Sequence, residues 1–293
     1  AHMLSITAVF FVFAWNTKEQ WYDSFIYKID ILELKKLLVF GLPLVIGGLA
    51  SWGLNVMDKI FLRGMSTFTE LGVYSVASSI AGAAAIFSGI FNTIWAPMVY
   101  RWVSEGVDLD KIDEISEYVL GAIYFVVVLS GLLSWTLPYF LPREYAVVQY
   151  LITACILGPL FYTLSEVTGV GITIVRKTSF SMAASIGAML VNLIGNYFLI
   201  PTYGAIGAAI STSIAFYVFY ILRTEFSSIL WRKKSNIRAY LIIGLLLIFV
   251  ILNMIYSLVL LYSLSLFAAL FFLGVIVFKK PLLLATSKIK SGI

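Results

Sequence analysis

The sequence has little charge and almost no histidine or cysteine. Only 12% of its 293 residues are charged, and it contains one histidine, His2, and one cysteine, Cys155. A single cysteine excludes an internal disulfide, and one cysteine with one histidine excludes the usual zinc sites. HExxH, CxxC and Gly-x-x-x-x-Gly-Lys motifs are also missing from the sequence. Metallohydrolases and P-loop ATPases are therefore disfavoured, and we expect neither a metal nor a cofactor.

Apolar side chains are abundant instead. They make up 61% of the residues, whereas soluble domains average about 45–50%. The apolar residues run on continuously rather than alternating with polar ones, which argues against outer-membrane strands. A span needs about 20 apolar residues, and the segments that qualify are 37–62, 71–100, 115–141, 147–174, 178–200, 204–222, 237–256 and 259–278. The sequence thus predicts an all-α polytopic membrane protein whose surroundings are a lipid bilayer, with no nucleic-acid partner.

The N-terminal segment departs from this pattern. Residues 4–15 form an apolar run of 12 residues, which is too short to span a bilayer. We expect the end of a truncated transmembrane helix here, the alternative being a short interfacial segment. The connection 16–36 follows and ends in charged and aliphatic residues at helical spacing, which predicts a cytoplasmic interfacial linker.

The placement of basic residues predicts the orientation. Most of the 20 lysines and arginines fall in alternate connections, namely 16–36, 101–114, 175–178, 223–238 and 279–293. The other connections contain only Arg63 and Arg143. By the positive-inside rule the first set is cytoplasmic, so the C-terminus is expected in the cytoplasm.

A few polar residues lie within the apolar segments and are functional candidates by default. Asn55 and Asp58 share one helix face with Gly48 and Ser51, while Lys59 points elsewhere. The alternative for Asp58 and Lys59 is that they lie near the outer interface and extend into water.

The segment 147–174 carries Glu166 close to Pro159. Glu166 either serves transport or only packs against a neighbouring helix. Asn192 and Asn196 lie on a stripe of small residues in 178–200, and a similar stripe with Gly82 and Gly89 runs along 71–100. Such stripes are most often helix-packing seams, and some also line a cavity.

Several motifs occur in a specific order between residues 37 and 222. They are Gly41-Leu42-Pro43, Asn55-x-x-Asp58-Lys59, Gly72-x-Tyr74-Ser75-x-Ala77, Trp95-x-Pro97, Asn192-x-x-x-Asn196 and Ile200-Pro201-x-Tyr203-Gly204-x-x-Gly207-Ala208-Ala209. In this order they resemble the Wzx-type polysaccharide and O-antigen flippases of the multidrug/oligosaccharidyl-lipid/polysaccharide (MOP) exporter superfamily.

The resemblance implies a domain organisation. Members of the superfamily consist of two six-helix lobes, often with two extra C-terminal helices. Residues 1–36 would then be the truncated helix end and linker, and 37–222 the six-helix second lobe. Residues 223–293 would hold a cytoplasmic loop, two extra helices and a basic tail. The N-terminal lobe is missing from this sequence and is expected as a partner.

The resemblance also implies a function: a flippase, not an enzyme, which moves a polyprenyl-diphosphate-linked oligosaccharide across the cytoplasmic membrane by alternating access. Polysaccharide polymerase machinery is a further expected partner. The candidates for contact with the sugar are Trp52, Asn55, Asn192 and Asn196. Lys59 on the outer side, and Arg101 and Arg176 at the inner mouth, are candidates for the diphosphate. Asp58 or Glu166 would couple H⁺ or Na⁺, and Pro43, Pro97 and Pro159 are hinge candidates.

Two other functions are weighed against this one. An ion-coupled drug or cation antiporter of the same superfamily would favour an acidic, aromatic-lined cavity. A membrane-embedded glycan polymerase or ligase would need catalytic side chains on a large outer loop, and the short outer connections offer none.

The predicted orientation is open to test by cysteine labelling. Single cysteines are introduced at 142–146 and at 223–238 in a Cys155→Ala background, and intact cells are treated with a membrane-impermeant thiol reagent. We expect labelling at 142–146 only. Labelling at 223–238 without labelling at 142–146 would reverse the orientation.

Overall fold

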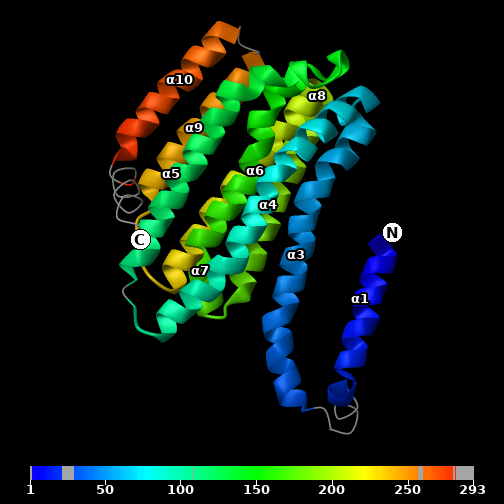
Figure 1. The fold of residues 1–293 in the computed structure, drawn as a ribbon, viewed down its shortest axis with the longest axis vertical. Helices are drawn as coiled ribbons and strands as arrows, with labels where there is room; N and C mark the ends of the chain where they lie inside the picture. The colour runs from blue at the N-terminus through cyan, green and yellow to red at the C-terminus, as the bar shows by residue number, and fades with distance from the viewer. Residues whose placement is uncertain (1, 22–29, 108, 257–259, 280, 282–293) are drawn as a thin grey trace. The chain divides into compact units, whose positions relative to one another are not determined.

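The computed structural model describes residues 2–21, 30–107, 109–256, 260–279 and 281. Seven helices in this part are long and apolar enough to cross a membrane, which confirms the predicted all-α polytopic architecture (Figure 1). The helices are α1 (His2–Asn16), α3 (Ile31–Met65), α4 (Phe68–Ser104), α5 (Asp110–Leu133), α6 (Val148–Thr168), α7 (Val170–Ile174), α8 (Thr178–Leu230), α9 (Ile237–Tyr256) and α10 (Leu260–Val277), with the 3₁₀-helices η1 (Ser134–Tyr139) and η2 (Arg143–Tyr145).

The chain divides into two compact units, Ala1–Leu42 and Pro43–Ile293. The first unit holds α1 and the beginning of α3. Asp30 caps α3, because its Oδ1 accepts hydrogen bonds from the backbone N–H groups of Leu32 (2.8 Å) and Glu33 (3.3 Å). Part of the predicted interfacial linker, residues 22–29, lies outside the described residues.

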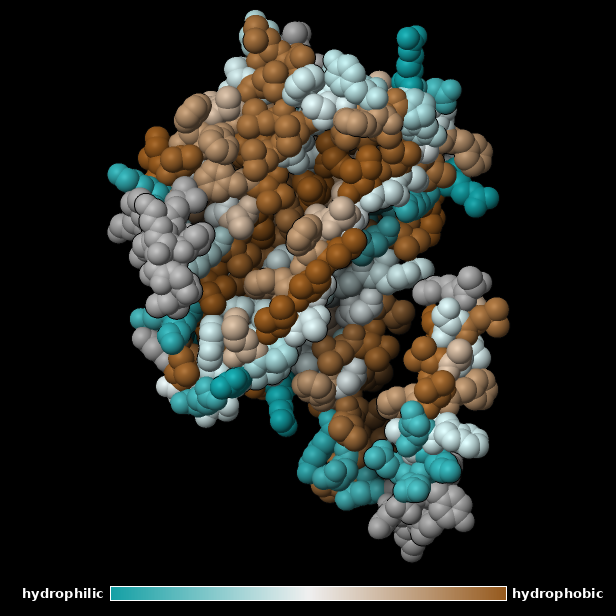
Figure 2. Space-filling model, viewed as in Figure 1, coloured by the Kyte–Doolittle hydropathy of each residue, from teal (hydrophilic) through white to brown (hydrophobic). Residues whose placement is uncertain are grey.

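The second unit is built around α6. This helix packs against α4, α5, α8 and α9, and most of its length is buried. The side of α4 that faces away from the bundle keeps apolar side chains such as Phe87 and Ile94 exposed. Figure 2 shows apolar side chains over much of the visible face of this unit, as expected for a surface that meets lipid.

Helix α8 folds back on itself at Gly204. Gly204 has φ 52° and ψ −127°, a conformation that only glycine adopts easily. The two halves are antiparallel, because Gly195 lies against Ser211 and Gly207 lies against Leu199. The Glu70 carboxylate of α4 accepts a hydrogen bond (2.8 Å) from the freed backbone N–H of Ala205. A carboxylate from another helix thus caps the start of the second half.

The structure shifts three boundaries of the predicted spans. The segment 115–141 leaves the α-helix after Leu133 and continues as η1, which contains Pro138; proline cannot donate a backbone hydrogen bond. The segment 147–174 divides at Gly169 into α6 and α7. The helix expected to end at 222 continues to Leu230, so Arg223, counted above with the cytoplasmic loop, lies inside α8.

The two C-terminal helices pack on different neighbours. Helix α10 lies on α5, where the Tyr124 hydroxyl donates a hydrogen bond to the Leu270 carbonyl (2.8 Å). Helix α9 lies on α6 and α8, where the Tyr217 hydroxyl donates to the Tyr240 carbonyl (2.8 Å). Most of the predicted basic tail lies outside the described residues.

The turn in α8 makes a specific demand on Gly204. A Cβ at this position would lie 2.6 Å from Glu70 Oε2, in addition to the strain of the positive φ. We expect Gly204→Ala to lower the free energy of unfolding by about 1–3 kcal/mol, measured as a fall in the melting temperature of the purified protein. The control is Gly64→Ala, because a Cβ at Gly64 meets nothing within 4 Å. Equal melting temperatures for the two variants would contradict this account of the turn.

Candidate functional site

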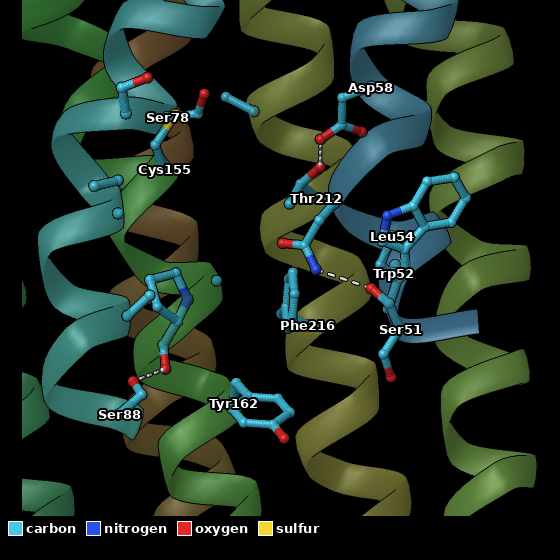
Figure 3. A pocket seen from close by; sticks show the side chains of 18 of the residues that line it. Ser51, Trp52, Leu54, Asp58, Ser78, Ser88, Cys155, Tyr162, Thr212 and Phe216 are labelled. Carbon is cyan, nitrogen blue, oxygen red and sulfur yellow. Dashed lines mark hydrogen bonds between the residues drawn. The ribbon is translucent and has the colours of Figure 1, made fainter. Parts of the chain in front are cut away.

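A cavity of about 750 Å³ lies between α3, α4, α6 and α8 of the second unit (Figure 3). Its lining extends along α4 from Tyr74 to Asn92. At 1.5 Å per residue this is about 27 Å of helix, close to the ~30 Å thickness of a bilayer's hydrocarbon core. The cavity therefore extends over most of the depth that a polar molecule would have to cross.

The cavity wall combines hydroxyl groups, aromatic rings and very small side chains. The lining includes hydroxyls of Ser51, Ser78, Ser79, Ser88 and Thr212, the rings of Trp52, Tyr162, Phe216 and Phe219, and the small residues Gly82, Ala85 and Gly89. Tyr162 and Phe219 stack almost in parallel, with ring centroids 5.9 Å apart. Part of the small-residue stripe of α4 thus faces open space rather than another helix.

Asp58 occupies the most polar part of this wall. Its side chain comes from α3, and the residue is only 1% exposed. Asp58 Oδ1 accepts hydrogen bonds from the amide groups of Asn192 (3.0 Å) and Asn196 (2.8 Å). Asp58 Oδ2 accepts from the hydroxyls of Thr212 (2.5 Å) and Tyr74. Figure 3 shows Thr212 reaching this carboxylate from α8. The alternative that Asp58 extends into interfacial water does not fit its burial.

The donors around Asp58 are all uncharged. In the described part of the chain Asp58 takes part in none of the ion pairs. Four donors stabilise a carboxylate through charge-assisted hydrogen bonds, but they leave its negative charge uncompensated. The Asn196 Oδ1 atom is also buried and has no hydrogen-bond partner. A buried carboxylate with only neutral donors thus lies beside an unused oxygen ligand.

The residues predicted to contact the sugar or the diphosphate divide into two groups. Trp52, Asn55 and Lys59 line the cavity, where Asn55 donates a hydrogen bond to the Ser51 carbonyl (2.8 Å). Asn192 and Asn196 are fully buried, and their amide groups hold Asp58 rather than face the cavity.

The remaining predicted residues lie elsewhere. Arg101 is exposed and pairs with Glu105 (2.8 Å), and Arg176 is exposed with φ 57°. Neither arginine is in the cavity lining. Of the hinge candidates, Pro159 lines the cavity, Pro97 is exposed in α4, and Pro43 begins the second unit within α3.

Glu166 does not join Asp58. It forms a two-pronged ion pair with Arg223 of α8: Arg223 Nη1 donates to Oε1, and Nη2 donates to Oε2 at 3.2 Å. The residue Arg223 is 5% exposed. The pair lies one helical turn beyond Tyr162 on α6 and beyond Phe219 on α8, so it adjoins the aromatic part of the cavity wall.

Sequence reasoning missed three of these residues. Tyr74 and Thr212 carry no charge and lie in apolar runs, so only the spatial contact with Asp58 identifies them. Arg223 was assigned to a basic connection. Arg223 and Ser227, four residues apart, share one helix face, and this spacing is the signal in the sequence that the helix continues.

Comparisons with known proteins agree with this architecture. NorM of Photorhabdus laumondii, a probable multidrug resistance protein, is 24% identical over 212 residues, covering 66% of this chain and 47% of NorM. Agl15 of Haloferax volcanii, a probable low-salt glycan biosynthesis flippase, is 20% identical over 188 residues, covering 63% of this chain and 40% of Agl15. CapF of Staphylococcus aureus, a capsular polysaccharide biosynthesis protein, is 23% identical over 238 residues, covering 74% of this chain and 59% of CapF.

Among solved structures, the lipid II flippase MurJ in an inward closed conformation has a similar fold. The TM-score is 0.54 at 17% identity, and the match covers 86% of this chain and 56% of MurJ. No family model matches the chain. These similarities confirm the resemblance to the MOP exporters and support a membrane transporter or flippase rather than an enzyme. The chain spans about half the length of the relatives that it matches.

The cavity is open to test through the single cysteine. Cys155 lines the cavity, whereas a Cβ at Gly82 meets nothing within 4 Å. Gly82→Phe is therefore expected to place its ring in the cavity, leaving the melting temperature within a few degrees of the wild type and slowing the labelling of Cys155 by N-ethylmaleimide several-fold. Gly64→Phe, outside the cavity lining, is the control. Unchanged labelling of Gly82→Phe would mean that Gly82 and Cys155 do not share one cavity.

Proposed function

We propose that this chain forms part of a flippase for polyprenyl-diphosphate-linked oligosaccharides in the cytoplasmic membrane, with its C-terminus in the cytoplasm. The observation that carries the proposal is the cavity along α4, because its polar and aromatic lining extends over about 27 Å of an otherwise apolar bundle. A glycan cannot cross the hydrocarbon core unaided, since each unpaired hydroxyl costs several kcal/mol there. A lining of this kind replaces water along the path.

The chemistry of the lining suits sugars. Serine, threonine and asparagine side chains exchange hydrogen bonds with sugar hydroxyls, and the rings of Trp52, Tyr162 and Phe216 offer flat apolar faces for the C–H faces of a pyranose. The polyprenyl tail would remain in the bilayer against the exposed apolar side chains of the bundle (Figure 2). Lys59 supplies a positive charge in the cavity lining for the diphosphate.

Alternating access requires two bodies that rock against each other around the substrate. The chain spans about half the length of its relatives, so we propose that a second helical lobe acts with it. Residues 37–222 would then be one wall of the transport path.

We further propose that Asp58 couples transport to H⁺ or Na⁺. Its support is the uncompensated charge of a buried carboxylate that lines the cavity. A proton would neutralise Asp58 directly. Na⁺ would take oxygen ligands from the Asp58 carboxylate, the Thr212 hydroxyl and the side-chain oxygen of Asn196. Either ion would alter the hydrogen bonds that join α3, α4 and α8.

An ion-coupled antiporter of organic cations is the second candidate. It is favoured by the same observation, an acidic residue in an aromatic-lined cavity, and by the similarity to NorM. The two candidates differ in what the cell loses with the gene: a flippase mutant loses surface glycan and accumulates the lipid-linked precursor, whereas an antiporter mutant becomes sensitive to cationic dyes.

The two proposals are tested in the native host, where every partner of the chain is present. Asp58→Asn keeps the shape of the side chain and removes its charge. We expect it to reduce surface glycan at least tenfold, with the precursor accumulating and the amount of membrane-inserted protein near wild type. Glu105→Gln, which alters an exposed ion pair worth little, is the matched control and should export normally.

Two outcomes would decide against these assignments. Unchanged glycan together with sensitivity to cationic dyes in a gene deletion would replace the flippase with the antiporter. Normal export by Asp58→Asn at equal protein level would remove Asp58 from the coupling step and leave it a structural role.

A further inference from the structure

The Glu166–Arg223 ion pair lies one helical turn beyond Tyr162 and Phe219, outside the cavity lining itself. Phe219 and Tyr162 line the cavity and stack on each other. Arg223 follows Phe219 by one turn, with its guanidinium carbon 5.4 Å from the centroid of the Phe219 ring, and Glu166 follows Tyr162 by one turn. A molecule that moves along the aromatic wall would meet these two charges next.

The guanidinium of Arg223 is not fully satisfied. Glu166 occupies both Nη atoms, and Ser165 Oγ accepts a longer hydrogen bond from Nη1 (3.4 Å). The Nε atom is buried and has no hydrogen-bond partner. A buried N–H group without an acceptor is uncommon in folded proteins and requires an explanation.

Gly169, at the break between α6 and α7, lies directly beside this atom. A Cβ at Gly169 would lie 3.1 Å from Nε and 2.5 Å from the Ser165 carbonyl oxygen. Any side chain at residue 169 would therefore crowd the unused donor. On the other side of the pair, the Glu166 side chain is 24% exposed, whereas that of Arg223 is 6% exposed. Glu166 is the partner that can turn away without being buried elsewhere.

We propose that Arg223 is an anion subsite at this end of the cavity, and that Glu166 occupies it until a phosphate group replaces the carboxylate. This inference rests on the proposed function and specifies which chemical group of the substrate is bound here. A guanidinium binds carboxylate and phosphate oxygens with the same two-pronged geometry. A phosphate oxygen that approaches the side of the guanidinium would accept hydrogen bonds from Nε and one Nη atom, and would give the unused N–H an acceptor.

The depth of Arg223 fits this role. Arg223 precedes the end of α8 at Leu230 by seven residues, about 10 Å, on the side that the charge distribution predicts to be cytoplasmic. The diphosphate of a polyprenyl lipid lies near that membrane surface, because its charges stay out of the hydrocarbon. Lys59 lines the part of the cavity next to Asp58, so positive groups lie at separate levels along the path.

The subsite is tested by ligand-induced stabilisation of the chain purified from its own membrane. The probes are a short-chain polyprenyl diphosphate, the matching polyprenol without phosphate, and inorganic diphosphate. Binding raises the melting temperature in proportion to affinity and concentration. We expect the polyprenyl diphosphate to stabilise the wild type and the polyprenol to do so far less. Stabilisation by inorganic diphosphate alone would assign the subsite to free phosphate rather than to a lipid.

The variants separate an anion subsite from a purely structural ion pair. Arg223→Gln is expected to weaken binding of the polyprenyl diphosphate roughly tenfold or more. Glu166→Gln removes the competing carboxylate and is expected to tighten binding several-fold, although it lowers the melting temperature without ligand. The double variant Glu166→Gln/Arg223→Gln restores much of the stability, because it leaves no unpaired buried charge, but it should not regain the affinity. Arg238→Gln, at an exposed pair with Glu117, is the control and should bind as the wild type does.

Each alternative result has a distinct meaning. Equal affinity in the wild type and in all Arg223 and Glu166 variants would overturn the subsite while leaving the flippase proposal intact. Recovery of both stability and affinity in the double variant would make the pair structural. A wild-type protein that binds neither the polyprenyl diphosphate nor its glycan-bearing form would contradict the proposed function itself, and with it the subsite.

Discussion

Asp58 is the point at which three transmembrane helices are joined. Its carboxylate extends from α3 and accepts hydrogen bonds from Tyr74 of α4 and from both halves of α8, through Asn192 and Asn196 before the turn and Thr212 after it. A charge in a low-dielectric interior is tolerated only when several groups solvate it. The turn at Gly204 is what brings residues on either side of it to the same carboxylate. The turn in α8, held by the Glu70 cap at Ala205, is thus a condition for the four hydrogen bonds that solvate the Asp58 carboxylate.

The sequence predicts the helices well and their contacts poorly, and the reason is physical. Length and continuous apolarity are local properties, so the spans and the small-residue faces can be found one segment at a time. The donors to Asp58 lie on other helices, 16 residues away at Tyr74 and more than 130 at Asn192, and no local pattern indicates them. The partners of Asp58 can therefore be identified only from the folded structure.

For Arg223 the sequence predicts the wrong position. Counting basic residues at helix ends places it in a cytoplasmic connection, because positive charge is normally a sign of the aqueous side. In the structure Arg223 lies inside the helix, since Glu166 of a neighbouring helix compensates its charge. The positive-inside rule uses the sum of many charges and tolerates one misplaced arginine, so the predicted orientation does not depend on Arg223. A single residue's position, by contrast, depends on its partner.

The glycines of α4 distinguish a packed seam from a space that must remain open. Glycine inside a helix costs up to about 1 kcal/mol relative to alanine, so each one needs a reason. At Gly131 and Gly274 the reason is packing, because a Cβ would lie 2.4 Å from the ring of Phe267 or of Tyr124. At Gly82 and Gly89 a Cβ meets nothing within 4 Å, and both residues line the cavity. Packing does not account for these two glycines. Their lack of a side chain keeps the cavity open along α4, beside the buried carboxylate of Asp58.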